Sequence, residues 1–74
     1  MSKKKQFFGE LVPGDVVVST GFWNYADMVV SVVLRDCGVD LTYVRLWSVP
    51  APGNVLWSET RSRDYLLYDY LEVL

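Results

Sequence analysis

Hydrophobic and polar residues alternate in short runs along this chain, and the longest apolar stretch lies in the middle. Residues 28–49 read MVVSVVLR, then DCGVD, then LTYVRLWSV. Val, Leu, Tyr and Trp dominate both arms, and such residues suit a pleated, half-buried surface. Gly38 can take a positive φ, and Asp36 and Asp40 can bond nearby backbone groups. The pattern therefore predicts a long central hairpin that turns within residues 36–40.

Two registers of this hairpin fit the pattern, and they bring different side chains together. A loop of two or four residues would face Val30 and Val32 toward Trp47 and Arg45. A loop of three or five residues separates apolar from polar groups better, because Thr42 and Ser48 are then the only polar groups on the apolar face. We favour the odd loop, and a slip of one residue would reverse every face. The apolar face of the odd loop consists of Met28, Val30, Val32, Leu34, Val44 and Leu46.

The favoured register leaves a second face that is too apolar to lie freely in water. Two explanations stay open at this point. The chain's own Trp57 and C-terminal segment cover this face, or a partner molecule does. The face carries Val29, Ser31, Val33, Arg35, Leu41, Tyr43, Arg45 and Trp47.

Shorter elements flank the hairpin. Pro13 pre-sets φ at the second position of a turn over residues 12–15, and Gly14 suits the third position. Two prolines between residues 50 and 54 exclude a central strand there. The remaining pattern predicts strands at 16–20, 55–60 and 70–73, an aromatic loop at 21–27, a charged turn at 61–64, and a turn or single helical turn at 64–68.

Five short strands with Gly/Pro loops indicate an all-β fold, either a small sandwich or a barrel. The segment PGDVV at residues 13–17, an aromatic loop, a long hairpin, a shorter strand and a terminal apolar strand together resemble the SH3-like barrel superfamily. The resemblance implies a five-stranded SH3-like barrel or open sandwich with a short helical turn near the C-terminus. We expect a flexible basic tail at residues 1–6 and one such domain at residues 7–74. Plasmid-type endoribonuclease toxins share this opening but carry an arginine where Pro13 stands, so their activity is not implied.

The composition limits how such a chain is stabilised. A domain of 74 residues buries only roughly 60% of its surface. A single cysteine, Cys37, rules out an internal disulfide, and the absence of histidine removes the commonest metal ligand. With 51% hydrophobic and 22% charged residues, the chain needs dense packing or association. Met1 opens the chain, and we expect a complete small protein.

The net charge of −2 is unevenly distributed. Lys3, Lys4 and Lys5 carry +3, so residues 6–74 hold four arginines against nine acids, a net charge of −5. An acidic body argues against a phosphate-binding surface. No apolar run approaches the ~20 residues of a membrane span, and no signal-peptide core follows the lysines. With one free thiol, a cytoplasmic location is expected, in the host cytoplasm or the virion if the protein is viral.

Catalytic groups are scarce. No histidine can activate a nucleophile, and Cys37 stands beside Asp36, whose carboxylate would raise the pKa of the thiol. Turn formation explains the carboxylates near residues 36–40 and 64–69, which lack calcium-loop spacing. No glycine-rich phosphate loop is present, and a small body has little room for a cleft of ~300 Å³. We predict that the protein is not an enzyme and takes no cofactor, metal or small-molecule substrate.

Aromatic residues are numerous for this length, and Trp, Tyr and Arg anchor many protein interfaces. Val17, Val30, Val32, Val44 and Leu46 suffice for a small core, which leaves aromatic residues over for a surface. The predicted function is therefore binding of protein, by self-association or by docking in a larger assembly such as a phage or virus accessory or structural component. The alternative is a single-stranded RNA or DNA binder that uses Lys3–Lys5 and the loop at 21–27. The predicted partner-binding residues are Trp23, Tyr25, Val33, Tyr43, Arg45 and Trp47.

Overall fold

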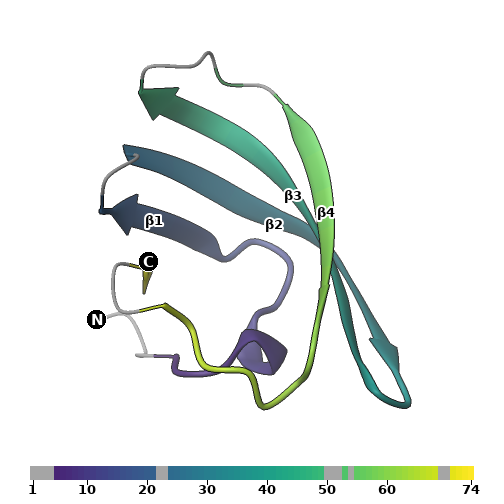
Figure 1. Cartoon of the computed structure of the whole chain (residues 1–74). Coiled ribbons are helices and arrows are strands. Elements are labelled where there is room, and N and C mark those ends of the chain that lie inside the picture. The colour runs from purple at the N-terminus through teal and green to yellow at the C-terminus, as the bar shows by residue number, and fades with distance from the viewer. Residues whose placement is uncertain (1–4, 22–23, 50–52, 54, 69–70) are drawn as a thin grey trace.

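The computed structural model is built on one five-stranded antiparallel sheet (Figure 1), and it describes residues 5–21, 24–49, 53, 55–68 and 71–74. A 3-10 turn, η1, comes before the strands. The strand order is β4-β3-β2-β1-β5, so the first four strands form a meander and the last returns to pair with the first. The elements are η1 (Phe8–Glu10), β1 (Val16–Thr20), β2 (Asn24–Arg35), β3 (Gly38–Val49), β4 (Leu56–Arg61) and β5 (Leu71–Val73).

The all-β class and the number of strands are confirmed, and the sheet is open. Strands β4 and β5 are its two edges and do not pair with each other in the part of the chain that the structure describes. The turn before β1 also forms as predicted. Gly14 has a φ of 98°, and the Asp15 amide donates to the Val12 carbonyl at 3.1 Å.

The hairpin register differs from the one that we favoured. Strands β2 and β3 are joined by only two residues, Asp36 and Cys37, and Val32 pairs with Leu41. Two bulges then shift the register, at Val30 in β2 and at Leu46 in β3, and each leaves one residue without a cross-strand partner. A bulge moves the following residues to the opposite face. The favoured pairing of faces therefore holds only between the bulges, where Met28 lies opposite Val44.

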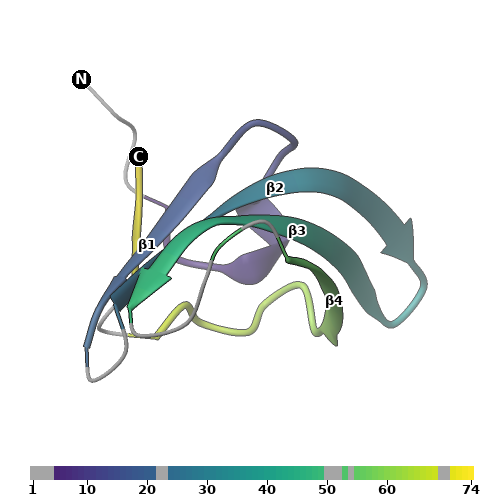
Figure 2. The same cartoon turned by 90° about the horizontal axis from the view of Figure 1, so that it is seen from above.

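One face of the sheet, here called the inner face, is covered by the chain's own ends. Figures 1 and 2 show η1 and the segment after β4 on this side of the sheet. Phe8 and Leu11 pack on Val29, Leu41 and other inner-face residues, and all four are at most 3% exposed. The buried cluster also contains Val17, Val39 and Tyr43, with Val32, Trp57, Leu67, Tyr68, Leu71 and Val73 packed against it.

This arrangement corrects the predicted core. Val17 is buried as expected, but Val30 and Leu46 are 40% and 43% exposed because they are the two bulge residues. The bulges divide the predicted second apolar face, so that its half with Val29 and Leu41 is covered by the chain itself, whereas Val33 and Trp47 are exposed on the opposite side of the sheet. Leu41 and Tyr43, which we placed on that face, are buried under Trp57, η1 and the C-terminal segment.

Three local predictions are also corrected. Strand β2 begins at Asn24, so half of the predicted aromatic loop is strand. The helical turn lies at η1 and not at residues 64–68, where the Tyr65 amide closes a turn onto the Ser62 carbonyl. Residues 5 and 6 belong to the folded body, since Lys5 pairs with Asp15 and the Gln6 carbonyl accepts a hydrogen bond from the Leu67 amide. Residues 1–4 of the predicted tail lie outside the described residues.

Among the described residues, no helix has the length and apolar character needed to cross a membrane.

Candidate functional site

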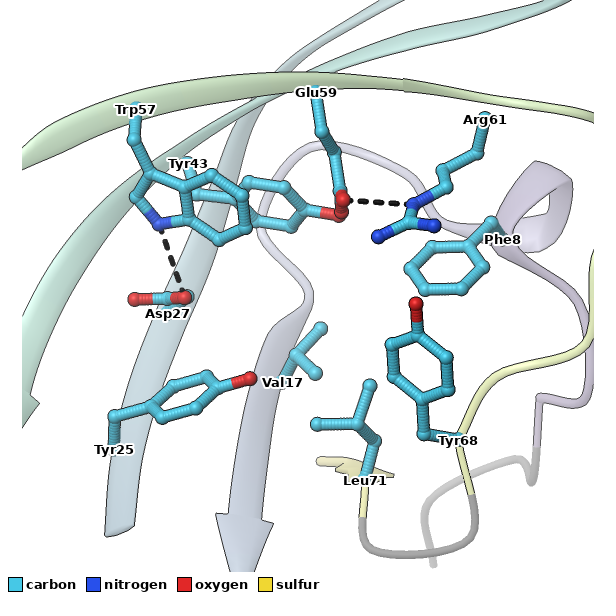
Figure 3. Close-up of a pocket in the computed structure, with 10 residues that line it drawn as sticks. All are labelled: Phe8, Val17, Tyr25, Asp27, Tyr43, Trp57, Glu59, Arg61, Tyr68 and Leu71. Carbon is cyan, nitrogen blue, oxygen red and sulfur yellow. Dashed lines mark hydrogen bonds and ion pairs between the residues drawn. The ribbon is translucent and has the colours of Figure 1, made fainter. Parts of the chain in front are cut away.

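Two surfaces of the sheet could carry a function, and the first is a small cavity on the inner face. It measures about 150 Å³ and lies between strands β1 to β4, η1 and the C-terminal segment (Figure 3). Its walls combine five aromatic side chains with the Glu59–Arg61 ion pair and the carboxylate of Asp27. The lining residues are Phe8, Val17, Tyr25, Asp27, Tyr43, Trp57, Glu59, Arg61, Tyr68 and Leu71.

The first ion pair joins neighbouring strands at one end of the cavity. The Nε and Nη2 atoms of Arg45 on β3 donate to the two oxygens of Asp27 on β2, at 2.8 and 2.9 Å. The indole Nε1 of Trp57 on β4 donates a third hydrogen bond to Asp27 at 3.1 Å. The hydrogen bond to Asp27 is the main cause that raises the pKa of Arg45. The charge of Asp27, which is 1% exposed, is thus balanced by Arg45, and its hydrogen bonds link β2 to β3 and β4.

The second ion pair lies at the other end of the cavity. The Tyr43 hydroxyl donates to Glu59 Oε2 at 2.6 Å, and Arg61 Nε donates to Oε1 of the same carboxylate at 2.8 Å. Burial raises the pKa of the Tyr43 phenol, and its hydrogen bond to Glu59 raises it further. The hydrogen bond to Glu59 raises the pKa of Arg61.

The aromatic faces of the cavity are occupied by these same arginines. The guanidinium carbon of Arg45 lies 4.2 Å from the ring centre of Tyr25, and that of Arg61 lies 5.1 Å from the ring centre of Phe8. Tyr43 and Trp57 stack on each other with ring centres 4.5 Å apart. An aromatic cage for an external cation needs open ring faces. Here the chain's own cations fill that position.

The cavity therefore acts as part of the core. Every buried side-chain nitrogen and oxygen atom in the described residues has a hydrogen-bond partner. The volume of about 150 Å³ is also well below the ~300 Å³ at which small-molecule sites begin. The described residues contain no group of three or more His, Cys, Asp or Glu side chains that could hold a metal ion.

The second surface is the opposite side of the sheet, here called the outer face. A row of directly paired residues crosses four strands there: Val16 on β1, Met28 on β2, Val44 on β3 and Leu56 on β4. A parallel row consists of Val18, Ala26 and Trp47, of which Ala26 is only 3% exposed. Neither row contains a charged or hydrogen-bonding side chain apart from the Trp47 indole. Figures 1 and 2 show η1 and the segment after β4 on the other side of the sheet.

Several outer-face side chains reach the solvent. Leu56 is 67% exposed, Trp47 is 46% exposed, and Val33, nearer the hairpin tip, is 48% exposed. Charged groups stand at the margins of the face. Arg35 pairs with Asp40 near the hairpin tip, and Glu72 lies on β5 opposite Val18. An apolar centre with a polar rim is the usual anatomy of a protein interface.

The predicted partner-binding residues divide between the two faces. Val33 and Trp47 lie on the outer face and are exposed. Tyr25 lines the cavity and Arg45 stacks on its ring, and both residues are half-buried. Tyr43 is only 2% exposed, so its prediction as a surface residue is wrong. Trp23 lies outside the described residues.

Sequence reasoning missed most of the outer-face rows. Val16, Met28 and Leu56 were read as strand residues without a surface role, and Val44 was assigned to the core. Their common face depends on three separate strand registers, which no single alternating pattern contains. The one usable signal was the odd-loop register, which already placed Met28 and Val44 on the same face.

Comparisons with protein-family models, with curated proteins and with solved structures find no match to this chain.

Proposed function

We propose that this chain is a non-enzymatic binding module that docks on protein through its outer face, by self-association or within a larger assembly. The observation that carries the proposal is the uncharged row Val16, Met28, Val44 and Leu56. Contiguous apolar patches on small soluble domains commonly mark interaction sites. The exposed Trp47 beside this row is the residue type most often found as an interface anchor.

The charge distribution also supports a protein partner. The chain outside Lys3–Lys5 carries a net charge of −5, so most of its surface repels other acidic surfaces. The row from Val16 to Leu56 carries no charge, so a protein can approach there without desolvating an ion. Burial of this apolar area stabilises a complex by roughly 25 cal/mol per Å² before the costs of association.

The nucleic-acid alternative has less support. Lys5, one of the three lysines on which it relies, is half-buried and paired with Asp15. Half of the aromatic loop that was to stack bases is the start of β2. A phage or virus origin stays a prediction that rests on size alone.

The proposal is tested by sedimentation velocity and by amide NMR spectra over a concentration series. We expect a mass above 8.5 kDa and concentration-dependent shifts at residues 28 and 44. Trp47→Ser and Leu56→Ser should weaken association by about tenfold or more. Leu66→Ser is the matched control, since Leu66 is 61% exposed but lies beyond the sheet. A wild-type monomer without shifts at about 1 mM, where even weak complexes form, would overturn self-association through this face.

A further inference from the structure

Strand β4 has an open edge whose backbone groups point away from the sheet. The Arg45 amide donates to the Val55 carbonyl, and Tyr43 lies opposite Trp57 two residues further along. In an antiparallel ladder, hydrogen-bonded and non-hydrogen-bonded pairs alternate. The odd-numbered residues from 55 to 61 therefore bond to β3. The N–H and C=O groups of Leu56, Ser58 and Thr60 point to the free edge.

This edge has few of the usual protections against strand pairing, although Glu59 and Arg61 are charged and point to the inner face. Natural edge strands are shortened, bulged, or interrupted by proline or lysine. Strand β4 spans six residues, LWSETR, with an unbroken register against β3 and neither proline nor lysine. The other edge, β5, is only three residues long. In the described part of the chain, no backbone hydrogen bond reaches Leu56, Ser58 or Thr60 from outside the sheet.

We propose that two copies of the chain pair β4 with β4 in antiparallel fashion about a two-fold axis at Ser58. In this register Ser58 lies opposite Ser58 of the second copy, and Leu56 lies opposite Thr60. All three edge residues then form hydrogen-bonded pairs, with about six backbone hydrogen bonds. The sheets of the two copies become one continuous sheet. This inference does not require that the outer face bind a partner, and the pairing would place two outer faces side by side.

The neighbouring registers are poorer. An axis at Glu59 would place two glutamates directly opposite each other, and like charges in that position destabilise a sheet. An axis at Trp57 would pair Thr60 with residue 54, beyond the end of β4. The register at Ser58 brings no like charges together, since Trp57 faces Glu59 of the second copy. A second copy is therefore the occupant that this edge fits.

The register is tested by disulfide trapping in a Cys37→Ser background, because Cys37 is exposed and would form its own crosslinks. Directly opposite residues in a hydrogen-bonded pair have Cα atoms about 5.5 Å apart, within disulfide range. We expect Ser58→Cys to form a covalent dimer on mild oxidation. Thr60→Cys, on the same strand and the same face, should give at least tenfold less. Equal trapping at both positions, or none at Ser58→Cys, overturns the proposal.

A second pair of variants separates the edge from the outer face. Ser58→Pro removes an amide that points to the free edge and leaves the ladder with β3 intact. We expect it to abolish the dimer seen by sedimentation, whereas Ser58→Ala, which also lacks the hydroxyl bonded to Thr42, should keep it. The far-UV spectrum of Ser58→Pro shows whether this variant still folds. If it does not fold, disulfide trapping at Ser58→Cys alone tests the edge pairing. A dimer lost in Trp47→Ser but kept in Ser58→Pro overturns the edge proposal and leaves the outer-face function standing.

Discussion

Arg45 and Asp27 form a two-pronged ion pair between β3 and β2, with the carboxylate 2% and the guanidinium side chain 25% exposed. Asp27 is buried, and its two carboxylate oxygens are compensated by hydrogen bonds from this partner and from the Trp57 indole. Removing one member of a buried pair leaves the other without compensation. We therefore expect Asp27→Ala to lower the free energy of unfolding by about 3 kcal/mol, measured by urea denaturation. Asp40→Ala is the control, since it removes the carboxylate from the exposed Arg35–Asp40 pair and should cost clearly less.

A double-mutant cycle with Arg45→Met separates the ion pair from lost packing. We expect a coupling energy of about 1 kcal/mol or more between positions 27 and 45, because the two side chains share two hydrogen bonds. Additive effects of the two substitutions would show that the pair does not stabilise the fold.

The second prediction concerns alkaline pH. The pKa of the Tyr43 phenol is raised from 10.0 by burial and by the Glu59 carboxylate. Below pH 10 the phenol is protonated in both the folded and the unfolded chain, so this group adds no pH dependence there. Above pH 10 the unfolded chain releases the proton first, so the free energy of unfolding falls by up to about 1.4 kcal/mol per pH unit.

Tyr43→Phe tests this assignment. The variant loses the hydrogen bond to Glu59 and should be about 1 kcal/mol less stable at pH 8. Its stability should then fall less steeply between pH 10 and 11 than that of the wild type, by urea titration at each pH. Parallel slopes for the two proteins would place the alkaline loss elsewhere.

The existence of the strands could be predicted from sequence because β-branched and aromatic runs are separated by Gly/Pro turns. Residues 16–20 and the Pro13–Gly14 turn illustrate this, since local chemistry alone decides them. The faces of the hairpin could not be predicted. Val30 and Leu46 sit at bulges, and nothing in a period of two indicates which residue will be skipped.

The residues of the candidate site were only partly predicted, because their faces depend on the same bulges and strand registers. Trp47 and Val33 were correctly placed on a surface, whereas Tyr43 was not. Tyr43 is buried because Trp57, which is fourteen residues later in the chain, stacks on its ring. Its hydroxyl group also donates a hydrogen bond to Glu59. Such contacts depend on the β3–β4 register and on η1, and neither leaves a trace in the local pattern around residue 43.

The third prediction separates two uses of glycine. Gly38 was expected to supply a positive φ, but the positive φ belongs to Gly14. A Cβ on Gly38 would instead lie 2.7 Å from the Arg61 carbonyl oxygen. We expect Gly38→Ala to cost about 1–3 kcal/mol by forcing β3 and β4 apart. Amide hydrogen exchange should accelerate near residues 38–40 and 60–61.

Gly14→Ala is the matched substitution, because a Cβ there meets no atom within 4 Å. Its cost should come from the backbone conformation alone, at about 1–2 kcal/mol. A D-alanine at position 14, introduced by chemical synthesis, should remove that cost. If Gly38→Ala leaves exchange at the β3–β4 end unchanged, the close approach to Arg61 is not what requires glycine.

The last prediction contrasts two aromatic residues on opposite faces of β3. Tyr43 is 2% exposed and Trp47 is 46% exposed. Tyr43→Ser removes a buried ring that packs on Trp57, so we expect a loss of about 3–5 kcal/mol, enough to unfold much of a domain this small. Trp47→Ser removes a ring that is nearly half exposed, so its cost should be clearly smaller than that of Tyr43→Ser and the fold should survive. Circular dichroism and urea titration of both variants measure these effects. Because Trp47→Ser keeps the fold, its association state then reports on the outer face alone. If Trp47→Ser unfolds the chain as Tyr43→Ser does, Trp47 contributes to the core and the outer face loses its proposed anchor.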